Sequence, residues 1–421
     1  MGQILLMSMA TAQNTSSPPL TLPLSQDDSF NFQLLAVLAV APYSGADVGP
    51  VLATAQQIEP GNFSSFSEAF YTLANTTKAE AEDPQNAYDP INVRDTWFSA
   101  ATYFRAADFF LHGDWTDPLI NLLWEEQTAA FDQALASLPV PGVRVRIPAD
   151  NFTVEAIWYS STAEGGAHRP TLILGNGYDG SQEDLYHTIV VPALARGWNC
   201  LTYEGPGQPS VRRSQNLGFI HDWERVVTPT IDYLLSEHAD DVDDARLVLF
   251  GFSFGGYLAA RAAAFDSRLA ALILDGGVYD TYAAYSAALS PELLDLYLSN
   301  NQTAFDSAAE SLRTDPSLPS SIRWGLEQGL WSFNTESAFE FLQRTSLFTL
   351  EGVTDRIQIP TWIANAEAEA FFPGQSAQVA EALGDRATLH NFTGAAAYHC
   401  QVGAFQELSR TMFAWLNQTL S

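Results

Sequence analysis

The chain has 421 residues, of which 47% are hydrophobic and 12% aromatic, so it exceeds one ordinary domain and can bury a large core. Its formal net charge is −30, and Lys78 is the single lysine among 19 basic residues. Because phosphate binding needs clustered lysine or arginine, this composition argues against binding to nucleic acid or to anionic membrane surfaces. It also disfavours strongly anionic substrates. No apolar run reaches the roughly 20 residues that span a bilayer.

Residues 1–28 are polar and rich in proline and serine, and we expect a leader there. A short apolar stretch ends in A-x-A at positions 10–12, as in a signal peptide, although no basic segment precedes it. We therefore expect a secreted or secretory-pathway glycoprotein, with the cytoplasm as the alternative. Seven N-x-S/T sequons support this expectation: Asn14, Asn62, Asn75, Asn151, Asn301, Asn391 and Asn417.

Residues 29–140 show helical periodicity and no strand alternation, with clear patterns over 95–111 and 119–138. This segment predicts a helical N-terminal domain, and its aromatic stripe is typical of a core. The segment Pro139 to Gly142 then marks a boundary.

Strands alternate with helices after this boundary, which predicts an α/β fold with a mostly parallel sheet and an antiparallel start. Residues 141–277 and 350–421 form the expected core. Residues 278–349 are helical and interrupt it between strands, so we expect a cap insertion there. The expected strands are 143–147, 152–158, 171–174, 198–203, 246–250, 269–274, 357–365 and 388–392, and a final helix is expected over 402–416.

The most informative motif is GFSFGG at residues 251–256, which follows an apolar strand and opens a small-residue helix. A G-x-S-x-G turn between a strand and a helix is a nucleophile elbow, which exposes its serine on a tight turn at the top of a sheet. Ser253 is therefore the candidate nucleophile, and the turn is typical of the α/β-hydrolase fold.

In that fold the acid and then the histidine follow the serine along the chain. His399 is the single histidine after the last expected strand, so it is the candidate base. Glu367 and Glu369 both follow the preceding strand, and either could orient the histidine. We favour Glu369, because the acid of this fold commonly lies four residues before the proline that starts the next helix, here Pro373.

An oxyanion hole needs two main-chain N–H groups. One should be that of Phe254, and the other that of Tyr178 or Gly177, in the loop after the strand 171–174. That loop also fits G-x-G-x-x-G over 175–180, with Glu204 at the end of the next strand, which resembles a dinucleotide fingerprint. A nucleotide-binding oxidoreductase is thus a rival interpretation, but it explains neither the elbow nor the later acid and histidine.

The other chemistry-bearing residues predict no cofactor and no metal, because the chain has neither C-x-x-C nor H-x-x-x-H. Cys200 and Cys400 are expected to be buried thiols rather than a bridge.

Four stretches carry a resemblance to a known group of proteins: YEGPGQ at 203–208, the segment 251–264, FFPGQ at 371–375 and HCQVGA at 399–404. The chain resembles α/β-hydrolases with an N-terminal helical domain, such as 2,6-dihydropseudooxynicotine hydrolases and fungal polyketide-shortening hydrolases of pigment biosynthesis. The resemblance implies a site between the core and the helical domain. It also implies action on C–C bonds of 1,3-dicarbonyl compounds, or on esters, lactones or thioesters. The chain departs from the family pattern at Glu369, where aspartate is common, at Pro209 and over 394–398.

We therefore expect a serine hydrolase that forms an acyl-enzyme with a neutral, apolar secondary metabolite. Acyl transfer or cyclisation by the same three residues is an alternative, and a non-catalytic binding protein is another. The expected partner is a small-molecule substrate, and we expect neither nucleic-acid binding nor a membrane span. Whether the chain forms a homodimer is left open.

Overall fold

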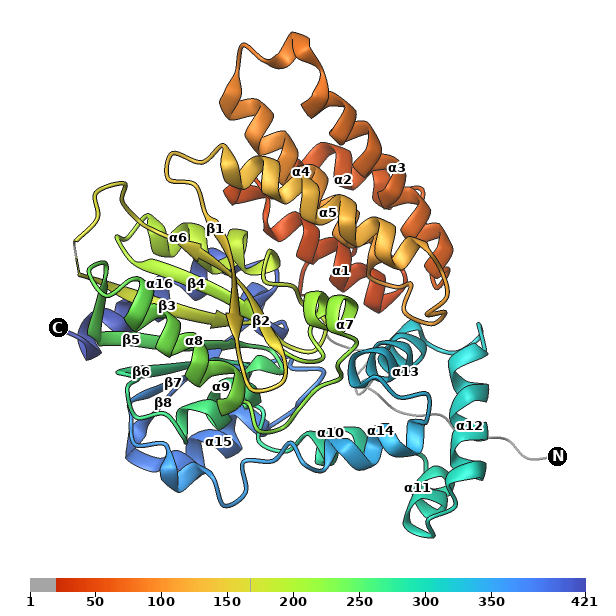
Figure 1. The fold of residues 1–421 in the computed structure, drawn as a ribbon. Helices are drawn as coiled ribbons and strands as arrows, with labels where there is room; N and C mark the ends of the chain where they lie inside the picture. The colour runs from red at the N-terminus through yellow and green to blue at the C-terminus, as the bar shows by residue number, and fades with distance from the viewer. Residues whose placement is uncertain (1–19, 167) are drawn as a thin grey trace.

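The structure is a computed structural model that describes residues 20–166 and 168–421. An eight-stranded sheet forms its centre, with the strand order β1-β2-β4-β3-β5-β6-β7-β8 (Figure 1). The first strands pair antiparallel, β1 with β2 and β2 with β4, and all other neighbours are parallel. The strands are β1 Val143–Pro148, β2 Thr153–Tyr159, β3 Arg169–Gly175, β4 Asn199–Glu204, β5 Val242–Phe252, β6 Ala271–Asp275, β7 Thr361–Ala366 and β8 Ala387–Phe392.

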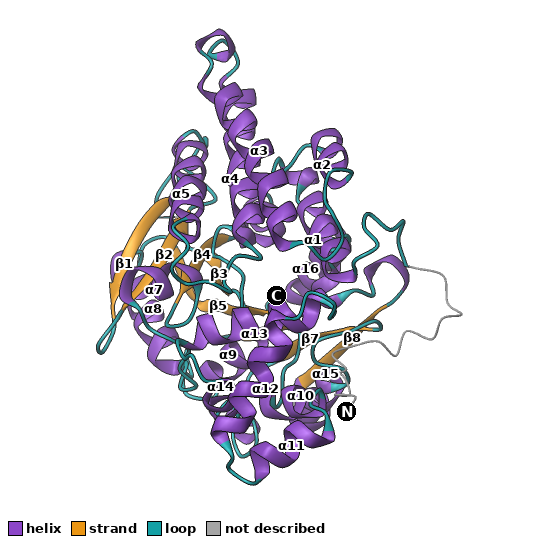
Figure 2. Ribbon diagram, turned by 90° about the vertical axis from the view of Figure 1, so that its right-hand side faces the viewer, coloured by secondary structure: helices purple, strands orange, loops and turns teal. Residues whose placement is uncertain are grey.

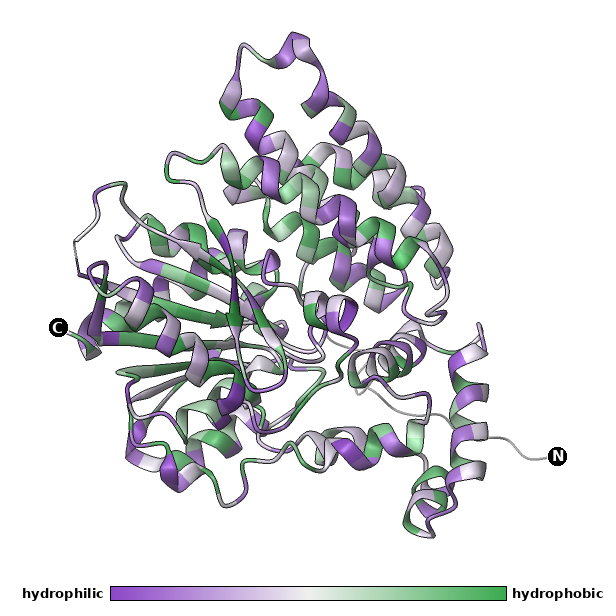
Figure 3. Ribbon diagram, in the orientation of Figure 1, coloured by the Kyte–Doolittle hydropathy of each residue, from purple (hydrophilic) through white to green (hydrophobic). Residues whose placement is uncertain are grey.

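The central strands are apolar because both faces of the sheet are covered, and Figure 3 shows them as largely hydrophobic. Leu172 and Leu174 of β3 pack into the core cluster on one face, and Ile173 between them packs into the cluster on the other face. Helices α6 (Val191–Leu194) and α16 (Phe405–Thr419) contribute to the first cluster. The helices that contribute to the second are α8 (Glu224–Glu237), α9 (Gly255–Ala263) and α15 (Gln375–Leu383).

A layer of helices precedes the sheet in sequence and rises from it at the top of Figure 1. We call these helices, α1 to α5, the N-terminal helices. Phe30, Phe66 and Phe110 pack together at their centre, with ring centroids 4.9 Å apart. Their bounds are α1 Asp28–Ala39, α2 Val48–Ala55, α3 Phe63–Glu82, α4 Pro90–Asp108 and α5 Leu119–Ala136.

A second group of helices, here the inserted helices, lies between β6 and β7 in sequence. They gather at one side of the sheet, and α13 (Ser320–Phe333) is the member that contacts the N-terminal helices, through α1 (Figures 1 and 2). They have an apolar cluster of their own that includes Leu293, Phe305 and Leu326. The bounds are α10 Thr281–Ala287, α11 Pro291–Leu298, α12 Gln302–Thr314, α13 Ser320–Phe333 and α14 Ala338–Thr345. The short helix α7 (Pro209–Gln215) follows β4.

The α/β fold with a mostly parallel sheet is confirmed, and the differences lie at element ends. The strand expected over 357–365 starts only at Thr361, because residues 354–356 form a 3₁₀ turn and Pro360 follows. The last helix is shifted to Phe405–Thr419.

The leader predictions fall mainly on residues 1–19, which lie outside the described residues together with the sequon at Asn14. The six described sequon asparagines are all exposed. No helix in the two described ranges is long and apolar enough to cross a membrane.

Candidate active site

Ser253 lies on the sharp turn between β5 and α9, in the left-handed backbone region with φ at 60°. A non-glycine residue in this region costs roughly 1–2 kcal/mol, so the surrounding packing must hold it there. Its N–H donates to the Asp275 carbonyl at 2.6 Å. A Cβ at Gly251 would lie 2.0 Å from the Gly255 carbonyl oxygen, and one at Gly256 would lie 1.8 Å from that of Gly276. Glycine is therefore required on both sides of the serine.

The structure brings Ser253, His399 and Glu369 into one hydrogen-bonded chain. His399 Nε2 lies 2.7 Å from Ser253 Oγ, and its Nδ1 lies 2.6 Å from Glu369 Oε2. The histidine is buried, whereas the serine is half-buried. The three residues come from the ends of different elements: the β5 turn, the loop after β7 and the loop after β8.

Of the two candidate acids, Glu369 reaches the histidine. Its Oε1 accepts the N–H groups of Phe371 and Phe372 at 2.8 and 3.1 Å, so both carboxylate oxygens are engaged. Glu367 is exposed and belongs to the surface. Burial alone would raise the pKa of Glu369, but His399 and the two N–H groups outweigh it and lower the pKa.

The His399 imidazole responds in the opposite direction. Burial alone would lower its pKa, yet the Glu369 carboxylate raises the pKa above its ordinary value, with smaller contributions from Asp275 and Asp179. An imidazole between a hydroxyl and a carboxylate can take the hydroxyl proton and keep it as an imidazolium.

The loop after β3 lies directly against the serine. A Cβ at Gly177 would come within 2.9 Å of both Ser253 Cβ and the Phe254 nitrogen. The Gly177 N–H is already bonded to Asn176 Oδ1 at 2.8 Å. Across the described chain, no protein acceptor is bonded to the N–H of Tyr178 or of Phe254. Both donors lie next to this contact, since Tyr178 follows Gly177 and Phe254 follows Ser253 in the chain.

The glycines of this loop are explained by packing rather than by a nucleotide phosphate. A Cβ at Gly175 would lie 2.5 Å from the Tyr203 hydroxyl, and one at Gly180 would overlap the Asn176 side chain. Glu204 is fully buried and accepts the N–H groups of Gln182 and Ser210. The expected helix does not start at the last glycine, because residues 181–183 are not helical and helical structure begins at Asp184. Packing therefore accounts for the glycine pattern that resembles a dinucleotide fingerprint.

Sequence reasoning missed the groups that hold this loop from outside the sheet. Arg105 of α4 donates from Nη2 to the Asp179 carbonyl at 2.6 Å. From α13, Gln328 Nε2 and Ser332 Oγ lie 3.4 and 3.3 Å from the Tyr178 carbonyl. The N-terminal and the inserted helices thus both bond to the loop that carries the free N–H group.

A buried charged cluster joins the N-terminal helices to the core beside this loop. Both oxygens of Asp108 on α4 accept from Arg213 Nη2 on α7, at 2.9 and 2.8 Å. His112 bonds Gln328 Oε1 at 2.6 Å, which links the cluster to α13. Burial would raise the pKa of Asp108, but Arg213, His112 and Arg105 lower it strongly. No sequence pattern indicates this cluster, because its members come from distant segments.

Asp275, at the end of β6, is a second buried carboxyl near the histidine. Its side chain is fully buried, and neither carboxyl oxygen has a hydrogen-bond partner in the described chain. Burial raises the pKa of this group to about 7. Cys400 and Cys200 are buried and unbridged, and the described residues hold no cluster of three metal-ligating side chains.

An elbow serine at the top of a mostly parallel sheet, with a histidine and an acid on later loops, defines the class of α/β-hydrolases. The chain belongs to the alpha/beta hydrolase family, whose profile matches residues 172–403, and it is a hydrolase enzyme. Hydrolase LUC6 of a Fusarium species is 30% identical over 409 residues, 93% of this chain and 96% of that protein. The 20-hydroxy-prefusarin hydrolase FUS2 of Gibberella moniliformis is 29% identical over 414 residues, 94% of this chain and 97% of that protein.

Among solved structures, the 2,6-dihydroxy-pseudo-oxynicotine hydrolase matches with a TM-score of 0.70 at 18% identity, covering 91% of this chain and 95% of that one. Such coverage means that the likeness of fold extends beyond the sheet to the helices around it. The resemblance expected from the sequence is thereby confirmed.

Proposed function

We propose that this hydrolase acts through Ser253 as nucleophile, His399 as base and Glu369 as the group that orients and stabilises the imidazolium. The observation that carries the proposal is the hydrogen-bonded chain of 2.7 and 2.6 Å that ends on a half-buried serine. The two free N–H groups, of Tyr178 and Phe254, support it as an oxyanion hole.

The proposed reaction has two halves. Ser253 Oγ attacks a carbonyl carbon while His399 takes its proton, and the negative oxygen accepts from the Tyr178 and Phe254 N–H groups. The bond to the leaving group then breaks, and His399 returns the proton to the departing alkoxide, thiolate or enolate carbon. Water, deprotonated by His399, cleaves the acyl-enzyme to a carboxylic acid and restores the serine.

The proposed substrate is a neutral, apolar secondary metabolite: a 1,3-dicarbonyl or polyketide cleaved at a C–C bond, or an ester or lactone. C–C cleavage needs an enolate leaving group, since an unstabilised carbanion cannot depart. The net charge of −30 disfavours anionic substrates. Aromatic side chains border the serine and histidine, with the Phe371 ring 4.7 Å from that of His399. The FUS2 relative, a prefusarin hydrolase by name, favours the same substrate class.

The test is turnover of an aryl 1,3-diketone, an aryl ester and a lactone in ¹⁸O-labelled water, with product masses measured for wild type and Ser253→Ala. We expect one ¹⁸O atom in the acid product of wild type and no reaction above background in the variant. Consumption of the substrate without ¹⁸O in the product would show that the enzyme catalyses acyl transfer or cyclisation and not hydrolysis. Equal turnover by both proteins would contradict Ser253 as nucleophile.

A further inference from the structure

Asn176 connects the two ends of the loop that carries the Tyr178 N–H group. The asparagine is buried, and its side chain makes two hydrogen bonds to the main chain. Oδ1 accepts the Gly177 N–H at 2.8 Å, and Nδ2 donates to the Ser181 carbonyl at 2.8 Å. Only this orientation of the carboxamide satisfies both partners, because an N–H group can only donate and a carbonyl can only accept. We call this pair of bonds the Asn176 bridge.

The main chain of Asn176 is held as well. Gln208 is fully buried, and its Nε2 donates to the Asn176 carbonyl at 2.7 Å, while its Oε1 accepts the Gly205 N–H at 2.8 Å. This glutamine ends the stretch YEGPGQ, which carries part of the family resemblance. The Asn176 carbonyl and the Gly177 N–H belong to one peptide unit. Both polar groups of that unit are therefore bonded, one to Gln208 and the other to the Asn176 bridge.

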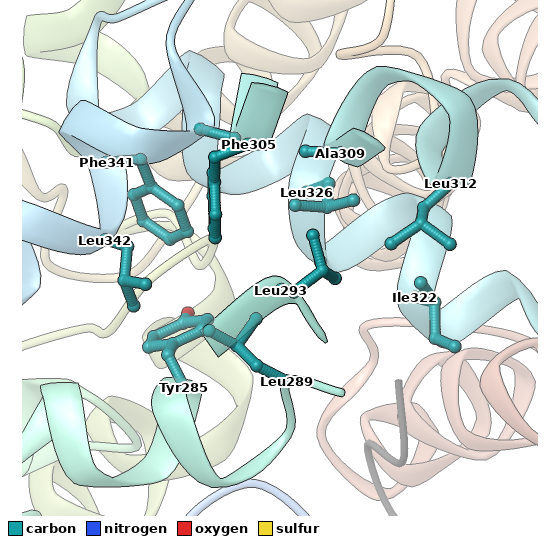
Figure 4. Close-up of a pocket in the computed structure, with 12 residues that line it drawn as sticks. Tyr285, Leu289, Leu293, Phe305, Ala309, Leu312, Ile322, Leu326, Phe341 and Leu342 are labelled. Atoms are coloured by element: carbon teal, nitrogen blue, oxygen red, sulfur yellow. The ribbon is translucent and has the colours of Figure 1, made fainter. Parts of the chain in front are cut away.

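The side chain of Tyr178 is held separately, by the inserted helices. Its hydroxyl donates to the Gly325 carbonyl at 3.1 Å. Its ring lies 6.3 Å from that of Tyr285, at an apolar cavity that Gly325 and Tyr285 line (Figure 4). The direction of the Tyr178 N–H depends in addition on the backbone at Gly177, where close packing against Ser253 requires a glycine. Because glycine rotates more freely than other residues, the backbone there needs an additional restraint.

We propose that Asn176 is a positioning residue that selects the Tyr178 N–H as the oxyanion donor of this loop. The inference rests on the proposed function, because it explains how one donor of the proposed oxyanion hole is chosen and aligned. Oδ1 of Asn176 occupies the Gly177 N–H and so removes it as a competing donor. The bonded peptide unit also restrains the next unit, which carries the Tyr178 N–H. A donor that is aligned before the reaction stabilises the developing negative charge without reorganisation.

The expected effect is smaller than that of losing a donor. Removal of one oxyanion donor lowers kcat roughly 10²- to 10³-fold. Asn176→Ala would leave the Tyr178 N–H in place but would release the peptide unit before it and free the Gly177 N–H. We therefore expect a loss of about 10- to 100-fold in the rate of attack by Ser253.

The test measures how fast a fluorophosphonate labels Ser253 in wild type, Asn176→Ala and Asn199→Ala. This reagent needs no known substrate, and its phosphoryl oxygen takes the place of the oxyanion. Asn199 is the matched control, since it is 1% exposed, against 4% for Asn176, and also bridges an N–H and a carbonyl, those of Ser161 and Asp241. It lies at the start of β4, whereas Asn176 follows the end of the parallel strand β3. We expect labelling to slow about 10- to 100-fold in Asn176→Ala and less than about twofold in Asn199→Ala, although both variants lose melting temperature.

A second readout separates positioning from a general loss of structure. For an ester that wild type cleaves, kcat of Asn176→Ala should fall with the labelling rate, while KM changes less than about threefold. A trifluoromethyl ketone, which adds to Ser253 as a tetrahedral anion, should lose affinity in parallel, and the matching methyl ketone should not. Gln208→Met removes the bond to the Asn176 carbonyl and should show the same pattern more weakly. It provides the test if Asn176→Ala does not fold.

The possible failures can be told apart. Labelling of folded Asn176→Ala or Gln208→Met at the wild-type rate would overturn the role of Asn176 and leave the proposed function standing. Equal slowing of Asn176→Ala and Asn199→Ala would also overturn it, because stability alone would then explain the loss. An unlabelled wild-type protein, or equal labelling of Ser253→Ala, would overturn the proposed function and this inference together.

Discussion

The sheet edge that carries Ser253 and the helices that cover it differ in how they hold their geometry. At the sheet edge, contacts between residues close in sequence set the geometry. Glycines flank a strained serine, and each loop contributes one catalytic side chain. At the covering helices, a few long-range polar contacts do the positioning, such as those of Arg105 and Asp108. The comparison indicates that the chemistry is encoded locally, whereas the shape of the site depends on contacts between distant segments.

The largest effect is expected at the acid, which short-range contacts hold against His399. Glu369→Gln keeps the shape but loses the charge that stabilises the imidazolium, so kcat should fall about 10³- to 10⁴-fold. Glu367→Gln, its neighbour on the exposed surface, should retain nearly full activity. Steady-state kinetics on the best ester checks both, and similar losses in the two variants would contradict the assignment.

The buried cluster on the helical side should matter for stability. Asp108→Asn removes the negative partner of Arg213 and leaves a buried guanidinium without its counter-charge, at a cost of about 3–5 kcal/mol in the free energy of unfolding. The control is Asp232→Asn, whose side chain is 63% exposed and whose pair with Arg268 should contribute at most about 1 kcal/mol. Urea unfolding measures both. Equal small losses would show that the cluster does not hold the helices to the core.

A smaller effect is expected where the two regions meet. Arg105→Met leaves the Asp179 carbonyl without its donor, so the loop beside Ser253 should become less well positioned. We expect a 10- to 100-fold fall in kcat with a smaller change in KM, a fraction of the loss seen when an oxyanion donor is removed outright. Arg94→Met on the same helix is the control, since Arg94 pairs with its neighbour Asp95. A change confined to KM would assign Arg105 to substrate binding instead.

The smallest effect concerns pH. His399 must be neutral to accept the serine proton, so activity should fall as the pH drops through the folded-state pKa of this residue. Because Glu369 raises that pKa, the acidic limb of kcat/KM should lie above the ordinary histidine value of 6.5. In Glu369→Gln the residual activity should show a limb shifted to lower pH. A limb at the same pH in both proteins would contradict the coupling.

The features that could be predicted from the sequence are those formed by residues close together in the chain. The sheet, the elbow serine and His399 follow from periodicity and from motif order, since adjacent residues create those patterns. The spacing to Pro373 already favoured Glu369 over Glu367, and the structure adds the contact of Glu369 with His399. Tyr178 and Gly177 could be separated only by the bond from the Gly177 N–H to Asn176. Asp108 and Gln328 leave no sequence signal, because each depends on packing between helices far apart in the chain.

The central claim, a base-activated Ser253, is tested most directly by the mass of the intact protein after treatment with a fluorophosphonate. We predict one adduct on the wild-type protein, located on the peptide that contains Ser253, no adduct on Ser253→Ala and strongly slowed labelling of His399→Ala. An unlabelled wild-type protein with a native melting curve, or equal labelling of Ser253→Ala, would contradict the claim.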